Sequence, residues 1–305
     1  MADGTAHAKA ILIGEHFVLD GVPAIALSLP GMQTRVRWRD DGATLHLSQR
    51  LRAALGPAQE QTLVMLRLAA ELAGAPARGE VDVRSTVPIG RGFGSSGALA
   101  VAALRAFGGS DWPAQKLLDA ARQIEAVVHG HSSGLDPATA MADGAAIAFR
   151  DGTVQRRIAP HASPALQRAR WLLTDVGEAP STGAAIARAR AARERLGPRA
   201  TGALRDRVAA AAAEAERGLR EGAPEAIAAA MRDNDAALRD LDVVDDRMAR
   251  RIATLQSLGA LAAKQSGAGL GGLILGLAPN PAVATLLRDR LADDGATSWI
   301  LEICP

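Results

Sequence analysis

A glycine-rich loop followed by an apolar helix is the segment of this 305-residue chain that is best suited to bind an anion. Residues 88–98 read Pro-Ile-Gly-Arg-Gly-Phe-Gly-Ser-Ser-Gly-Ala, and residues 98–106 form an apolar helical run. Glycine lets the backbone adopt positive φ and approach a ligand closely. The helix that follows begins with unpaired N–H groups at its positive dipole end. The pattern therefore predicts an anion site, and phosphate is the anion that it favours.

Two well-known nucleotide loops fit this segment less well. A Walker A loop ends in Gly-Lys-Ser/Thr, a tripeptide that does not occur in this chain. Residues 92–97 match the dinucleotide pattern G-x-G-x-x-G, which also needs an acidic residue at a strand end about 20 residues further on. Asp111 stands near that distance but precedes Trp112-Pro113 at a helix start. A plain glycine-rich turn remains the alternative, so other residues must decide.

Phosphoryl transfer needs a phosphate cradle, a divalent metal held by oxygen ligands, and charge stabilisation of the transferred group. An alcohol acceptor also benefits from a group that takes its hydroxyl proton. The residues outside the loop that could supply these functions are Lys9, Glu15, His16, Glu125 and Asp136. Each has a structural interpretation as well: a strand-edge lysine for Lys9, a solvated turn for Glu15 and His16, a solvated helix carboxylate for Glu125, and a helix N-cap for Asp136.

The composition excludes several classes of protein. The chain is 48% apolar but has only four Phe, four Trp and no Tyr, so its core must be aliphatic. A net charge of +2 and the scarcity of aromatic residues argue against nucleic-acid binding. The single cysteine, Cys304, excludes an internal disulfide and a multi-cysteine metal site. We expect no signal peptide, no membrane span and a cytoplasmic location.

The expected elements mix strands and helices without strict alternation, which is typical of an α+β protein with two domains. Residues 158–164 are the candidate domain junction. We expect strands at 10–13, 17–19, 24–27, 81–85, 145–149, 171–175, 260–264, 271–277 and 297–303, and a hairpin that pairs 36–38 with 44–47. We expect helices at 60–74, 97–107, 113–129, from about 136, across 181–257 with breaks near 197 and 222, and at 281–292.

Four segments in chain order resemble motifs of the GHMP kinases, and among these the mevalonate kinases most. Residues 9–24 begin Lys-Ala-Ile-Leu-Ile-Gly-Glu-His and resemble the first motif, and the loop at 88–98 resembles the second. Residues 125–136 resemble the segment Glu…His-Gly-x-Pro-Ser-Gly-Ile/Val-Asp, and residues 264–272 resemble the third motif. The resemblance spans nearly the whole chain.

The resemblance implies a two-domain α+β GHMP kinase fold with the active site in the inter-domain cleft. The N-terminal domain would cover residues 1–160 and the C-terminal domain residues 161–305. The chain departs from the family pattern at several motif positions: Phe93 replaces Leu, Gly97 replaces Ala, Ser132 stands where Pro is common, and Leu270 interrupts the glycine run of the third motif.

The resemblance also implies a role for each site residue. Asp136 would accept the proton of the substrate hydroxyl, while Lys9 would lower the pKa of that hydroxyl and stabilise charge on the phosphoryl group. Ser96 and Glu125 would hold Mg²⁺. The ATP phosphates would be bound by Pro88, Gly90, Gly92, Gly94, Ser95, Ser96 and Gly97. The mevalonate pocket would be lined by Glu15, His16, Thr182, Gly267 and Ala268.

The function implied by these roles is the ATP- and Mg²⁺-dependent phosphorylation of mevalonate to 5-phosphomevalonate, a step in isoprenoid precursor biosynthesis. Mevalonate is then the expected small-molecule partner, a homodimer is an expectation for the assembly, and neither nucleic acid nor membrane is expected. Two alternatives stay open. One is another GHMP small-molecule kinase, phosphomevalonate kinase first; the other is a non-catalytic GHMP-fold ligand sensor.

Overall fold

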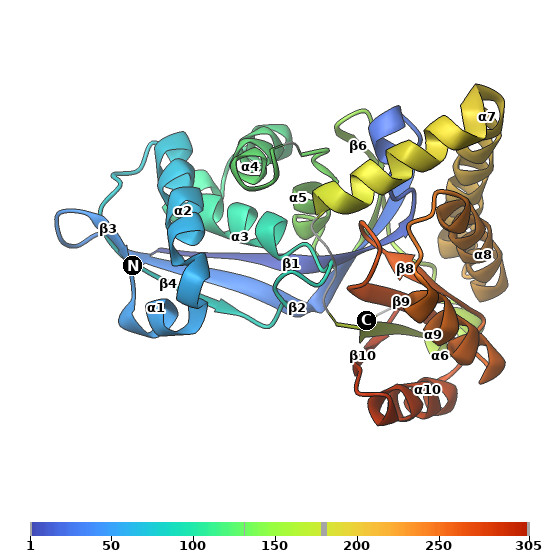
Figure 1. Cartoon of the computed structure of the whole chain (residues 1–305). Coiled ribbons are helices and arrows are strands. Elements are labelled where there is room, and N and C mark those ends of the chain that lie inside the picture. The colour runs from blue at the N-terminus through green and yellow to red at the C-terminus, as the bar shows by residue number, and fades with distance from the viewer. Residues whose placement is uncertain (1, 131, 178–181, 304–305) are drawn as a thin grey trace. The chain divides into compact units, whose positions relative to one another are not determined.

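The chain folds as an α+β protein, and the computed structural model describes residues 2–130, 132–177 and 182–303 (Figure 1). His131, in the predicted 125–136 motif, and Cys304 lie outside the described residues. The chain divides into two compact units, each built from separate stretches of sequence. Unit 1 consists of Met1–Lys9, Ser28–Ile89 and Gly94–Gly144, and unit 2 of Ala10–Leu27, Gly90–Phe93 and Ala145–Pro305.

The sheet of unit 1 is centred on the second half of strand β2. The strands that contribute to this unit are β1 (Ala2–Ile13), β2 (Ala24–Arg39), β3 (Leu45–Leu47) and β4 (Gly79–Ser85). Strand β4 pairs antiparallel with β2, with Thr34 opposite Ser85, and β3 pairs parallel with β4. The expected hairpin between 36–38 and 44–47 is therefore wrong, because β4 lies between these two segments.

Helices cover this sheet and supply the aliphatic core of unit 1. They are α1 (Gln49–Leu55), α2 (Gln59–Ala73), α3 (Ser95–Leu104), α4 (Ala114–His129) and α5 (Leu135–Ala140). Figure 1 shows α2, α3 and α4 over one face of the strands. Leu66, Leu104 and Ile124, one from each of these helices, are fully buried. Alanines fill much of α3, so the neighbouring helices can pack closely around it.

Unit 2 contains an antiparallel sheet in the order β10-β7-β9-β8. Its strands are β7 (Arg170–Asp175), β8 (Ala262–Ser266), β9 (Leu273–Ala278) and β10 (Thr297–Glu302). Leu172, Ile274 and Ala263 of this sheet pack with the buried faces of α9 (Asp246–Ser257) and α10 (Pro281–Asp293). The third predicted motif forms the end of β8 and the turn that connects it to β9.

Three further groups of elements complete unit 2. The first half of β2 pairs antiparallel with β5 (Ala146–Arg150), which pairs with β6 (Thr153–Ile158). The short helix α6 (Pro164–Arg168) precedes β7. The long helix α7 (Thr182–Glu221) lies beside α8 (Pro224–Asp240) and has a non-helical residue, Gly197, just before Pro198 (Figure 1).

Most of the expected elements are confirmed, with a few further differences. Residues 17–19 are not a strand, because Val18–Asp20 forms a short 3-10 helix that ends at Gly21 with φ of 74°. Strand β6 and helices α1 and α6 were not expected, since each carries too few buried apolar residues to produce a clear periodic pattern. No helix within the described residues is long and apolar enough to cross a membrane.

Two glycines provide a paired test of packing in the fold. A Cβ atom at Gly4 of β1 would lie 2.1 Å from the carbonyl oxygen of Ala102 in α3. A Cβ atom at Gly202 of α7 would meet no atom within 4 Å. Gly4→Ala should lower the free energy of unfolding by roughly 2 kcal/mol or more, because backbone would have to move. Gly202→Ala should raise it by about 0.5–1 kcal/mol, because it removes a helix glycine.

Urea unfolding of the two variants and of the unmodified chain measures both effects. Equal stability changes for Gly4→Ala and Gly202→Ala would contradict the close approach of β1 to α3.

Candidate functional site

An ion pair between the buried Lys9 and the partly exposed Asp136 forms the centre of the candidate site in unit 1. Lys9 Nζ lies 3.0 Å from Asp136 Oδ1. The Lys9 side chain is 4% exposed, so the interpretation of Lys9 as a strand-edge lysine in contact with water is wrong. The Asp136 side chain is 31% exposed and can therefore be reached by a small molecule.

Helix α5 presents Asp136 in its first turn. The N-cap of this helix is Gly134, so the expectation that Asp136 caps the helix is wrong. Gly134 has φ of 87° and its backbone turns the chain sharply into α5. The Asp136 carboxylate is thus available to Lys9 rather than being used by its own backbone.

The loop of residues 90–94 leads into α3 and makes room for Lys9. Gly94 is the N-cap of α3, with φ of 72°, and a Cβ atom there would lie 2.6 Å from Cγ of Lys9. Helix α3 begins at Ser95, two residues before the expected start, so Ser95, Ser96 and Gly97 form its first turn. Their N–H groups belong to the unpaired end of the helix, which favours an anion.

Glu125 of α4 places a second carboxylate in the same unit. The residue is 4% exposed, which excludes the solvated helix position that was the structural interpretation. Its Oε1 accepts a hydrogen bond from Ser96 Oγ at 3.3 Å, and its Oε2 accepts one from Ser132 Oγ at 2.6 Å. Burial, reinforced by the charge of Asp136, raises the pKa of Glu125 to about 7, although Ser132, Lys9 and Ser96 favour the ionised form.

These groups suit a divalent cation that is shared with phosphate. When Glu125 is ionised, two carboxylates and one ammonium leave an excess of one negative charge in this cluster, which a cation would offset. Within the described residues, no group of three or more His, Cys, Asp or Glu could hold a metal. One carboxylate, one hydroxyl, water and phosphate oxygens are the ligands that Mg²⁺ takes in phosphoryl-transfer sites.

Unit 2 holds the other part of the predicted first motif. His16 Nε2 lies 2.8 Å from the carbonyl oxygen of Ala268, and the backbone of His16 has φ of 62°. Burial lowers the pKa of His16, so the neutral ring donates its Nε2–H to Ala268. The residue is 8% exposed. This hydrogen bond brings the first and third predicted motifs together.

Glu15 is fully engaged by other residues of unit 2. Its Oε1 accepts from the fully buried Lys264, and its Oε2 accepts from Nδ2 of Asn234 at 2.8 Å. Oδ1 of Asn234 in turn accepts the backbone N–H of Gly14 at 3.1 Å. The buried network fixes the backbone that presents His16, and it excludes the solvated-turn interpretation of Glu15.

The third predicted motif packs against the glycine loop within unit 2. A Cβ atom on Gly92 would lie 3.3 Å from the carbonyl oxygen of Ser266, and one on Gly267 would lie 3.7 Å from Cα of Gly92. Leu270, which interrupts the glycine run, has φ of 61° and donates its N–H to the carbonyl of Val243 at 2.9 Å. It therefore keeps a left-handed backbone at a cost of about 1–2 kcal/mol.

The positions of Thr182, Pro88 and Gly90 connect them to no other predicted site residue through a described contact. Thr182 is the first residue of α7 and is exposed. Residues 178–181, which precede it, lie outside the described residues. Pro88 follows β4 and is partly buried. Gly90 is exposed at the start of the loop, with φ of 71°.

Sequence reasoning missed three polar residues that complete these networks. Ser132 enters the sequence analysis only as a departure from proline, and Lys264 only as the first residue of the third motif. Asn234 lies in an alanine-rich helix and carries no local signal. Its role depends on a contact with Gly14, 220 residues away, which no spacing rule detects.

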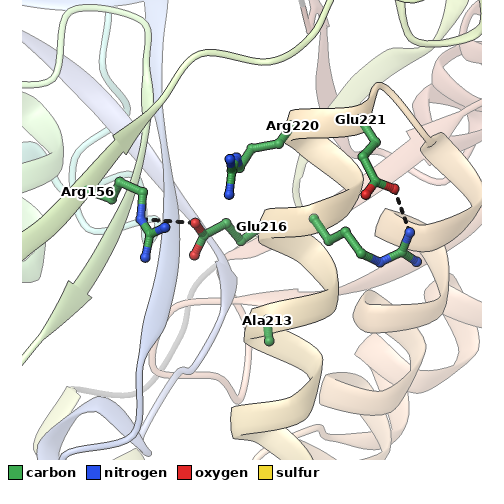
Figure 2. A pocket seen from close by; sticks show the side chains of 6 residues that line it. Arg156, Ala213, Glu216, Arg220 and Glu221 are labelled. Carbon is green, nitrogen blue, oxygen red and sulfur yellow. Dashed lines mark hydrogen bonds and ion pairs between the residues drawn. The ribbon is translucent and has the colours of Figure 1, made fainter.

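A hollow of about 420 Å³ elsewhere in unit 2 contains none of the predicted site residues. Figure 2 shows it between β6 and α7, where Arg156 and Glu216 form an ion pair of 3.1 Å. Arg217 pairs with Glu221 along the same helix. These charges largely neutralise one another, so the hollow does not compete as the catalytic site.

Comparison with known proteins gives consistent relatives. The mevalonate kinase of Aeropyrum pernix is 29% identical over 294 residues, covering 90% of this chain and 88% of the relative. The mevalonate kinase of Archaeoglobus fulgidus is 30% identical over 278 residues, covering 90% of this chain and 91% of the relative. The crystal structure of L. major mevalonate kinase in complex with R-mevalonate has a TM-score of 0.83 and 21% identity, covering 99% of this chain and 96% of that one.

Two family models match the chain as well. The GHMP kinases N terminal domain matches residues 61–144, which include the glycine loop, Glu125 and Asp136. The GHMP kinases C terminal domain matches residues 215–297, which include Asn234, Lys264 and the turn at 267–272. The predicted motifs and the two family models occur in the same order along the sequence. The chain belongs to the GHMP kinase family.

Proposed function

We propose that this chain catalyses the ATP-dependent phosphorylation of mevalonate to 5-phosphomevalonate. The observation that carries the proposal is the buried Lys9–Asp136 pair beside Glu125, because a charged cluster of this kind suits proton and phosphoryl transfer. The relatives that cover most of the chain support it, since the Aeropyrum pernix and Archaeoglobus fulgidus proteins are named mevalonate kinases.

The reaction assigns separate tasks to Asp136 and Lys9. The substrate hydroxyl oxygen attacks the γ-phosphorus of ATP, the bond to the ADP oxygen breaks, and the hydroxyl proton passes to the Asp136 carboxylate. Lys9 stabilises the negative charge that develops on the attacking oxygen and on the transferred group. Its pairing with Asp136 at 3.0 Å holds both groups in the orientation that this transfer needs.

The amides at the start of α3 would bind the ATP phosphates together with the glycines of the preceding loop. Ser96 and Glu125 would hold Mg²⁺, which when bound neutralises charge on the phosphates. Glu125 must be ionised to act as a ligand, and its two serine partners favour that form.

His16, Thr182, Gly267 and Ala268 are the proposed mevalonate-binding residues. We assign Glu15 a positioning role, because both of its carboxylate oxygens are engaged by Lys264 and Asn234. It would act on the substrate through the loop that carries His16.

We also propose an N-terminal domain of residues 1–160 and a C-terminal domain of residues 161–305. The two family models match residues 61–144 and 215–297, one on each side of this division. We further propose a cytoplasmic location and a homodimeric assembly.

The substrate assignment is tested by measuring ADP release with a panel of alcohols. We expect turnover with mevalonate that exceeds turnover with phosphomevalonate, galactose and homoserine, each at the same concentration with ATP and Mg²⁺. Mass spectrometry of the product should show one added phosphate. Preference for phosphomevalonate would replace the substrate assignment, and absence of turnover with all four would favour a non-catalytic ligand sensor.

Replacing Asp136 with Asn should slow catalysis while keeping the fold. Asn can still accept a hydrogen bond from Lys9 but cannot take the hydroxyl proton, so kcat should fall roughly 10²–10⁴-fold. The matched control is Asp143→Asn, because Asp143 is a carboxylate of the same unit that faces His7 at 3.7 Å. Steady-state kinetics and circular dichroism check both variants. Normal turnover by folded Asp136→Asn would remove Asp136 from the mechanism.

Replacing Glu125 with Gln should separate metal use from stability. The variant should need more Mg²⁺ for half-maximal activity, because an amide is a weaker ligand than a carboxylate. The pKa of Glu125, about 7 when folded, exceeds its usual 4.5, so the ionised form costs stability once the pH is above this range.

At pH 8 without metal, Glu125→Gln should therefore unfold at the same or a higher temperature than the unmodified chain. Asp119→Asn on the same helix is the control and should change neither quantity. An unchanged Mg²⁺ requirement in Glu125→Gln would exclude Glu125 as a ligand.

A further inference from the structure

We propose that Arg91 binds a phosphate group of the nucleotide, with its guanidinium positioned by Asp175. The inference rests on the proposed function, since it concerns the nucleotide that the kinase would use. It adds a side-chain ligand to a loop whose expected contacts are backbone amides and serine hydroxyls.

The Arg91 guanidinium has N–H donors that no described residue accepts. Its Nε is 3.5 Å from Oδ2 of Asp175, and its side chain is 29% exposed. Nη1 is buried and has no hydrogen-bond partner among the described residues. A guanidinium carries five N–H donors, so a contact on the Nε side leaves the N–H groups of the terminal nitrogens without this partner.

The loop around Arg91 is firmly held on one side and open on the other. Phe93 is fully buried and packs edge-on against Trp299, with ring centroids 5.3 Å apart. Gly92 packs against the carbonyl of Ser266, whereas a side chain added at Gly90 would meet nothing within 4 Å. The anchored residues fix the backbone of Arg91, and the open side next to Gly90 leaves space for a ligand.

Asp175 is itself held in place, so it can orient Arg91. It is the last residue of β7, opposite Thr297 of β10, and its Oδ1 accepts the N–H of Gly177 at 2.8 Å. The next residue, Val176, donates its N–H to the carbonyl of Gly272 at 2.8 Å. Both backbone contacts keep the carboxylate on the Nε side of the guanidinium.

Arginine is the side chain best suited to this task. Its planar fork donates two parallel hydrogen bonds to two phosphate oxygens, which lysine cannot do with one ammonium. The competing interpretation is that Arg91 and Asp175 form only a structural ion pair.

Substitutions of the two partners distinguish these interpretations. If the pair is only structural, Arg91→Ala and Asp175→Asn remove the same interaction and should have the same effect. If Arg91 binds phosphate, Arg91→Ala should weaken ADP binding about 10- to 100-fold. Asp175→Asn keeps an acceptor for Gly177 and removes a negative charge near the phosphate, so ADP affinity should stay within about threefold or rise.

Isothermal titration calorimetry with Mg²⁺ and ADP measures these affinities without relying on turnover. Arg91→Lys should fall between Arg91→Ala and the unmodified chain, because it keeps the charge and loses the fork. Arg290→Ala, which breaks an exposed ion pair of 3.1 Å on α10, is the control and should leave ADP affinity unchanged. The mevalonate KM should also be unchanged in Arg91→Ala, since the contact is with the nucleotide.

The outcomes separate this inference from the proposed function. If the unmodified chain binds ADP and Arg91→Ala binds it equally well, the phosphate role of Arg91 is overturned while the kinase assignment stands. Equal weakening by Arg91→Ala and Asp175→Asn also overturns it, in favour of the structural pair. If the unmodified chain binds no ADP, both the inference and the kinase assignment fail.

Discussion

Burying a lysine ammonium is costly unless an anion lies beside it, and this constraint accounts for much of unit 1. The Lys9 side chain is 4% exposed, so Asp136 must lie close, which requires α5 to begin with a sharp turn at Gly134. Gly94 must lack a side chain because the stem of Lys9 occupies that space. Gly94 is therefore explained by the lysine as much as by a ligand.

Glu125 makes the same cluster incomplete without a cation. Its carboxylate is buried near that of Asp136, and the single ammonium of Lys9 cannot offset both charges. The two serine hydroxyls satisfy hydrogen-bonding capacity but supply no charge. Unit 2 shows the opposite arrangement, since Lys264 and Glu15 neutralise each other completely. We infer that the cluster around Lys9 has a catalytic role and that the pair of Lys264 and Glu15 stabilises the loop that carries His16.

The extent to which the sequence predicted these features depended on how local each signal was. The glycine loop, helix α3 and the helices around Glu125 and Asp136 follow from spacing and apolar periodicity within about ten residues. Lys9, Glu125 and Asp136 were candidates from their residue types, the family resemblance implied their roles, and the geometry brings these three together.

The features that were missed depend on distant contacts. The expected hairpin is wrong because β4, more than 30 residues further along the chain, lies between β2 and β3 and pairs with both. The partners of Glu15 come from α8 and β8, at separations of 219 and 249 residues. The alternative interpretation of Asp136 as a helix cap is wrong, although Asp-Pro is a common helix start, because Gly134 is the N-cap and Asp136 pairs with Lys9.

The interleaving of the two units has a consequence for how the chain folds during synthesis. All of unit 1 lies within the first 144 residues, while residues 10–27 and 90–93 belong to unit 2 and find most of their partners after residue 145. Apolar side chains such as Leu12, Ile13 and Phe17, fully buried in the finished protein, emerge from the ribosome long before those partners. The nascent chain therefore passes through a stage in which unit 1 can form while the apolar segments of unit 2 that are already synthesised remain exposed to water. At this stage the chain is most exposed to aggregation and most dependent on chaperones.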